Sequence, residues 1–95
     1  MNIDNSGRVE AIRNALEPAF APAKLDIRDD SHRHAGHAGA QDGRGHFSVE
    51  IVSKAFVGMN ALARHRAIYA ALGDLMYTDI HALSIKAHTL NESGG

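Results

Sequence analysis

The sequence predicts a single α+β domain in which helices cover one face of a three-stranded mixed sheet. Three observations lead to this fold class. Apolar residues recur at helical spacing in two segments, they alternate with polar residues in three others, and these segments follow one another in the order α-β-β-α-β. A chain of 95 residues can bury one modest core, so we expect one domain over residues 1–95 with its ordered core at about residues 6–90.

The first helix is expected over residues 6–17, because its apolar residues recur every three or four positions. These residues are Val9, Ile12 and Leu16. Pro18 follows directly, and proline is disfavoured inside helices because it lacks an N–H donor. We therefore expect the helix to end at Glu17. The candidates for its N-cap are Asp4, Asn5 and Ser6.

Two strands are expected next, over residues 24–30 and 46–53, because apolar and polar residues alternate as in a strand with one buried face. Leu25 and Ile27 form the apolar side of the first strand, and Phe47, Val49 and Ile51 form that of the second. The intervening residues 31–45 are rich in glycine, alanine and histidine. This loop is longer than a usual hairpin connection, and loops of such length are usually functional or disordered.

The second helix is expected after a turn at Gly58, with Asn60 as its cap. Its inward stripe consists of Ala61, His65, Ile68, Leu72 and Leu75, flanked by Leu62, Tyr69 and Met76. The last strand is expected over residues 80–88, with one face formed by His81, Leu83, Ile85 and Ala87. Residues 91–95 are expected to form a frayed tail.

The charge and the apolar runs of the chain argue against several classes of protein. A net charge of −1 gives no overall attraction to nucleic acid or to anionic membranes. No apolar run approaches the length of a membrane span, and residues 1–10 lack the pattern of a secretory signal. We therefore expect a cytoplasmic protein with no membrane partner.

The residues available for chemistry point to imidazole ligands rather than to catalysis. The chain has no cysteine and seven histidines, so any thiolate must come from a partner. No phosphate-binding P-loop and no G-x-S-x-G nucleophile motif occurs in the sequence. We therefore expect a protein that is not an enzyme.

The candidate metal ligands are His32, His34 and His37, which lie close together in the glycine-containing loop. The alternative is that they belong to a solvated polar loop. Their spacing does not fit a closed zinc site. His81 is a further candidate because it opens the last strand, although a lone histidine beside apolar residues is more often structural. His65 lies in the helical stripe, where we expect a packing role.

Several short motifs in a fixed order resemble the BolA family over residues 9–90. These motifs are Asp30-Ser31 with His34, His46-Phe47, Ile51-Val52-Ser53 with Phe56 and Gly58, Arg64-His65-Arg66 with Tyr69, and His81-Ala82-Leu83. The resemblance implies a fold related to the type II KH module, which agrees with the element order expected from the residue patterns.

The resemblance also implies a partner and a cofactor. Proteins of this family pair with monothiol glutaredoxins and share a [2Fe-2S] cluster, to which the glutaredoxin and glutathione supply thiolates. The matching ligands in this chain are His81 and His34, and His37 or His32 are alternatives for His34. We accordingly expect a monomer alone, a heterodimer with glutaredoxin, and an adaptor role in iron–sulfur cluster trafficking or iron regulation.

Two other functions remain open at this point. The first is a DNA-binding transcriptional regulator that uses the KH-like fold, with a partner or nucleic-acid surface formed by Arg64, His65, Arg66 and Lys86. The second is docking on glutaredoxin without shared metal, through the second helix and the last strand.

Overall fold

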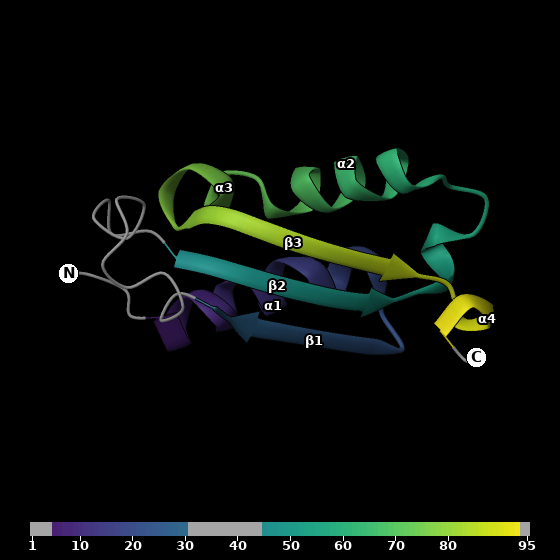
Figure 1. Ribbon diagram of the computed structural model, residues 1–95, viewed down its shortest axis with the longest axis horizontal. Coiled ribbons are helices and arrows are strands. Elements are labelled where there is room, and N and C mark those ends of the chain that lie inside the picture. The colour runs from purple at the N-terminus through teal and green to yellow at the C-terminus, as the bar shows by residue number, and fades with distance from the viewer. Residues whose placement is uncertain (1–4, 31–44, 94–95) are drawn as a thin grey trace.

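One mixed three-stranded sheet forms the centre of the protein in a computed structural model that describes residues 5–30 and 45–93. The strands lie in the order β1-β2-β3 (Figure 1). Strand β1 (Lys24–Asp29) is antiparallel to β2 (Gly45–Val52), whereas β3 (Ile80–His88) is parallel to β2. The expected order α-β-β-α-β and the mixed sheet are both confirmed.

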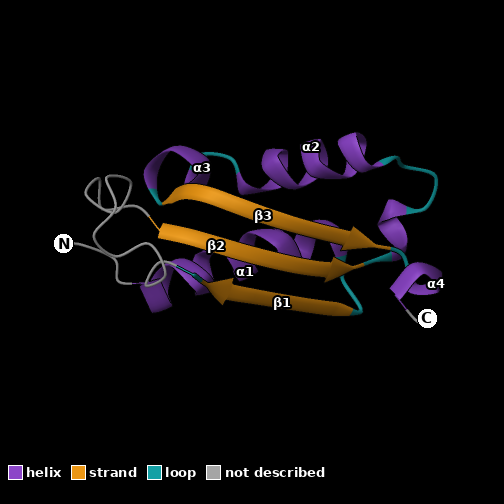
Figure 2. Ribbon diagram, in the orientation of Figure 1, coloured by secondary structure: helices purple, strands orange, loops and turns teal. Residues whose placement is uncertain are grey.

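The two long helices lie on one side of this sheet. Helix α1 (Asn5–Phe20) lies behind the strands in Figure 2, and α2 (Ala61–Leu72) runs along β3. Three short helical segments complete the fold. They are η3 (Lys54–Phe56), α3 (Leu75–Thr78) and α4 (Leu90–Ser93). None of the helices within the described ranges has the length and apolar character that a membrane crossing requires.

The alternation along β2 produces the core as expected. Phe47, Val49 and Ile51 are each at most 2% exposed and face the helices. From the helices, the core receives Ile12, Leu16, Ile68 and Leu72, and it is completed by Phe56 and Ile80. Burial of each large apolar side chain contributes about 1.5 to 3 kcal/mol. The intervening residues of β2 lie on the opposite face, which remains open in the described part of the chain.

Helix α1 extends further than the sequence indicated, because Pro18 lies inside it rather than after it. The prediction that the helix ends at Glu17 is wrong. The last turn gains contacts that offset the donor missing from proline. The ring of Phe20 lies 5.0 Å from that of Phe56, and the Ser53 hydroxyl donates to the Phe20 carbonyl at 2.6 Å. Ala21 then ends the helix with a φ of 43°.

The second helical region begins as predicted and ends early. The side chain of Asn60 accepts a hydrogen bond from the Ala63 N–H at 2.8 Å, which confirms the cap. Gly73 then adopts a φ of 55°, a left-handed value that ends α2. The predicted stripe is therefore split, and Leu75 belongs to α3. Three residues predicted to lie in or beside the stripe are exposed: Ala61, Leu62 and Tyr69.

The C-terminal region is folded where a frayed tail was predicted. Residues 90–93 form α4, and a capping box holds its first turn. The Glu92 carboxylate accepts from the Thr89 N–H at 2.9 Å, and the Thr89 hydroxyl accepts from the Glu92 N–H at 3.4 Å. For residues 91–93 the prediction is wrong, because a threonine and a glutamate three positions apart signal a helix start, and residues 94–95 lie outside the described residues.

Candidate metal centre at the start of strands β2 and β3

Strands β2 and β3 begin at the same end of the sheet because they are parallel, and β1 ends there because it is antiparallel. Two backbone bonds join these ends. The N–H of Gly45 donates to the Asp79 carbonyl at 2.9 Å, and the N–H of Asp30 donates to the His46 carbonyl at 2.8 Å. Residues 30 and 45, which flank the histidine-rich loop in the sequence, are therefore held at the end of the sheet where β2 and β3 begin.

A β-bulge in β3 determines where His81 lies. Gly45 is opposite Ile80, but His46 is opposite Ala82, so His81 is the extra residue on β3. Ile80 is 1% exposed, whereas His81 is exposed. The prediction that His81 shares a face with Leu83 is wrong, because the bulge interrupts the alternation.

The bulge brings His81 against His46. The centroids of the two imidazole rings are 4.9 Å apart and the rings are inclined by 52°. His46 is partly buried and lies at the start of β2. The sequence predicts no ligand role for His46. The contact between the two histidines follows from the register of two strands far apart in the sequence, so no local sequence pattern predicts it.

Three further elements fix this end of the sheet around Asp79. The guanidinium Nε of Arg8, in α1, lies 3.1 Å from the Asp79 carboxylate, and the two side chains are only 15% and 14% exposed. The hydroxyl of Thr78, at the end of α3, donates to the same carboxylate at 2.7 Å. Asp79, two residues before His81, is thus bonded to α1, α3 and β2. On β2, the Ser48 hydroxyl donates to the Asp30 carboxylate.

The described residues bring together two imidazoles, which do not form a closed metal site. No group of three or more histidine or acidic side chains suited to a metal occurs within residues 5–30 and 45–93. The loop candidates His32, His34 and His37 lie outside the described residues. Imidazole donors suit zinc, copper, iron and nickel, and two of them leave coordination positions for further ligands.

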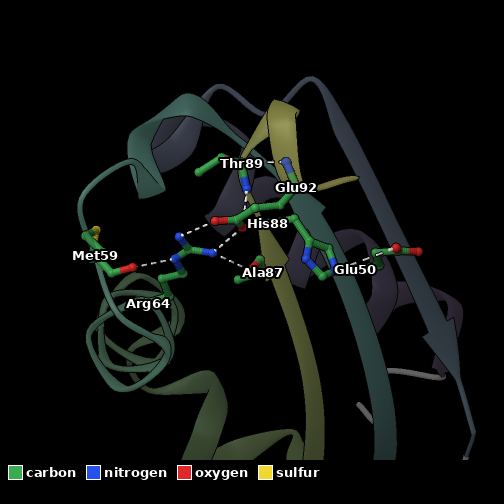
Figure 3. Close-up of polar contacts among 7 residues, drawn as sticks. All are labelled: Glu50, Met59, Arg64, Ala87, His88, Thr89 and Glu92. Atoms are coloured by element: carbon green, nitrogen blue, oxygen red, sulfur yellow. Dashed lines mark hydrogen bonds and ion pairs between the residues drawn. The ribbon is translucent and has the colours of Figure 1, made fainter. Parts of the chain in front are cut away.

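The second polar cluster lies at the opposite end of β3, around Arg64 of α2 (Figure 3). Its guanidinium donates to both Glu92 carboxylate oxygens at 2.6 and 3.0 Å, to the Ala87 carbonyl at 2.9 Å and to the Met59 carbonyl at 2.8 Å. The hydrogen bond from Arg64, with a second from the Thr89 backbone, lowers the pKa of Glu92 to about 2. Arg64 thus fastens α2, β3 and α4 together.

The four residues expected to form a partner or nucleic-acid surface are not gathered on one face. Arg64 is only 12% exposed at its side chain and is bonded as described above. His65 is partly buried on α2, and Arg66 is exposed there. Lys86 is exposed on the open side of the sheet, opposite Glu50 in the register. The exposed charges of Arg66, on α2, and Lys86, on the open sheet face, therefore do not form one continuous surface.

Comparison with known proteins assigns the family. A family model described as BolA-like protein matches residues 16–92. The chain belongs to the BolA family.

Among curated proteins, the chain is 45% identical over 89 residues to "Protein BOLA1, chloroplastic" of Arabidopsis thaliana, covering 90% of this chain and 56% of that protein. It is 45% identical over 83 residues to "SufE-like protein 1, chloroplastic/mitochondrial" of the same plant, covering 82% of this chain and 22% of that protein. It is 40% identical over 86 residues to the "DNA-binding transcriptional regulator BolA" of Escherichia coli K12, covering 90% and 79%. The chain thus spans about half of the first relative and about a fifth of the second.

Solved structures agree with the fold. The BolA domain of SufE1 from Arabidopsis thaliana superposes with a TM-score of 0.80 at 45% identity, covering 90% of this chain and 94% of that one. BolA1 from the same plant gives a TM-score of 0.78 at 41% identity, covering 96% and 99%. The α-β-β-α-β architecture is therefore that of known BolA structures.

Proposed function

We propose that this chain is a non-enzymatic adaptor that binds a monothiol glutaredoxin and shares a glutathione-ligated [2Fe-2S] cluster with it. His81 is the ligand from β3, and His34 is the ligand from the loop, with His37 and His32 as alternatives. The observation that carries the proposal is the presentation of His81 on a bulge, exposed and packed against His46.

Three features support a shared site rather than a resident one. The chain has no cysteine, so it cannot supply the thiolates that hold such clusters. Two imidazoles lie at an exposed end of the sheet, beside the residues that flank a loop with three more. The backbone before His81 is fixed by the bonds of Asp79, which limits the movement of the ligand before the partner arrives.

The shared cluster gives this chain a definite chemical contribution. Imidazole in place of thiolate on one iron raises the reduction potential of a [2Fe-2S] cluster, as in Rieske centres. His81 and the loop histidine would hold one iron from this side. His46 would restrict the orientation of His81 by packing against its ring, and in that role it is a positioning residue.

The test is anaerobic reconstitution of the full chain with a monothiol glutaredoxin, glutathione, iron and sulfide. We expect a heterodimer whose visible circular dichroism differs from that of the glutaredoxin homodimer. His81→Ala should change that spectrum, whereas His88→Ala, at the far end of the same strand, should leave it unaltered. A heterodimer whose spectrum does not respond to His81→Ala would refute His81 as a ligand and would indicate docking without shared metal.

A DNA-binding regulator is the second candidate, because the Escherichia coli relative at 40% identity carries that description in its name. A KH-like use of the fold would need a G-x-x-G loop. The one such string in the sequence, at residues 36–39, lies outside the described residues. DNA binding that weakens steeply with added salt would support this function, and its absence at low salt would remove it.

A further inference from the structure

The charged side chains along the edge strand β1 are complementary to those of β1 in a second copy of the chain. Strand β1 lies at the edge of the described sheet, beside β2 alone. Lys24, Asp26, Arg28 and Asp30 alternate in sign along its open side. The first three are exposed, and Asp30 is partly exposed. Edge strands present unpaired backbone groups that can accept another strand.

The backbone N–H and C=O groups of β1 point in the directions that such pairing requires. Asp30 donates its N–H to His46 in β2. Alternate residues of an antiparallel strand direct their N–H and C=O groups to the same side. Lys24, Asp26 and Arg28 therefore bond toward β2, whereas Leu25 and Ile27 direct their backbone groups away from the sheet.

The charges select one register of antiparallel self-pairing. With Ile27 opposite Ile27 of the second copy, Asp26 is opposite Arg28 and Lys24 is opposite Asp30. By symmetry each of these pairs occurs twice, so all four contacts between charged residues join opposite signs. Opposite charges directly across two strands are stabilising and like charges are destabilising.

Neighbouring registers are disfavoured by the same charges. A shift of two residues in one direction places Lys24 opposite Arg28 and Asp26 opposite itself. A shift in the other direction places Asp26 opposite Asp30 and Arg28 opposite itself. A shift of one residue would put the open face of one sheet on the same side as the helix-covered face of the other.

We propose that two copies of this chain associate through their β1 strands, in the register centred on Ile27, to form a continuous six-stranded sheet. The interaction is isologous, and the open faces of the two sheets become one polar surface. The proposal differs from the monomer expected from the sequence, and it does not depend on the proposed cluster or on glutaredoxin.

The test uses a charge reversal that should not harm the fold. Asp26 is opposite Glu50 in β2, so Asp26→Arg replaces a like-charge pair inside the monomer by an opposite-charge pair. In the dimer, the introduced arginine lies opposite Arg28 of the other copy, so the same change creates two like-charge pairs. The double variant Asp26→Arg/Arg28→Asp restores opposite signs across the interface. Glu10→Arg, which is exposed on α1, makes the same change in net charge elsewhere.

Sedimentation velocity over a wide range of protein concentration measures the dissociation constant of each variant. We expect a reversible dimer for the unmodified chain, about tenfold weaker association for Asp26→Arg, recovery in the double variant, and no change for Glu10→Arg. In the amide NMR spectrum, Leu25 and Ile27 should shift with concentration. A chain that is monomeric throughout, an unaffected Asp26→Arg dimer, or a double variant that fails to recover would each overturn the proposal.

Discussion

Ile80 links the stability of the fold to the placement of His81, and truncating its side chain tests that link. Ile80 is 1% exposed and belongs to the core, although its neighbour His81 is exposed. The bulge is held in place on one side by this buried side chain. Ile80→Val removes one methyl group and should cost about 1 kcal/mol, whereas Ile80→Ala should cost about 3 kcal/mol through lost burial and the cavity left behind.

These magnitudes are measurable in a domain of this size, whose unfolding free energy is expected to be about 5 to 15 kcal/mol. In urea, with a slope of about 1 to 1.5 kcal/mol per molar, the midpoint should fall by about 1 M for Ile80→Val and by about 2 to 3 M for Ile80→Ala. Leu90→Ala, at a side chain that is 53% exposed, serves as a control and should change stability by less than about 0.5 kcal/mol. If Ile80→Ala cost no more than the Leu90 control, the buried anchor beside the bulge would be refuted.

Three other outcomes follow from particular contacts. Ala21→Gly should stabilise the fold by about 0.5 kcal/mol in chemical denaturation, because glycine relieves the φ of 43°. The pKa of Glu92 is lowered from 4.5 to about 2, so its contribution to stability is complete above pH 4.5 and is lost as the pH falls toward 2. Glu92→Gln should remove that part of the pH dependence, and an unchanged acid profile would contradict the ion pair with Arg64. His46→Ala should alter the visible circular dichroism of the shared cluster and His46→Phe should retain it, because a ring of similar shape can still orient His81. Loss of the spectrum in both variants would instead make His46 a ligand.

The sequence was sufficient for the fold because the relevant signals are local. The alternation of Phe47, Val49 and Ile51 predicted the buried face of β2, and Asn60 predicted the start of α2. These patterns depend on the periodicity of one element and on a cap within the next turn. The residues that define each helix or strand also form its apolar face. They therefore predict that the helices pack on one face of the sheet.

Two of the errors in the fold involve contacts between distant segments. Pro18 stays helical because Phe20 packs against Phe56 and accepts from Ser53. Helix α4 is held by the local capping box of Thr89 and Glu92 and also by Arg64, 28 positions away in the sequence, which binds Glu92. Neither of these long-range contacts is visible in a window of neighbouring residues.

The candidate site was predictable only in part for the same reason. His81 was identified as a candidate from its position at a strand start, but its orientation depends on a bulge set by pairing with β2. The sequence predicts no contact between His46 and His81, because the two residues meet only when β2 and β3 are in register. The ligand assignments to His81 and His34 remain predictions.

The most direct test of the shared-cluster proposal is to detect nitrogen from this chain bound to iron. The chain would be prepared with ¹⁵N-histidine, reconstituted with unlabelled glutaredoxin and glutathione, and reduced for pulsed electron paramagnetic resonance. We expect strong ¹⁵N couplings to the reduced cluster that diminish in His81→Ala and persist in His88→Ala. A reduced cluster without ¹⁵N coupling from this chain would contradict the proposal.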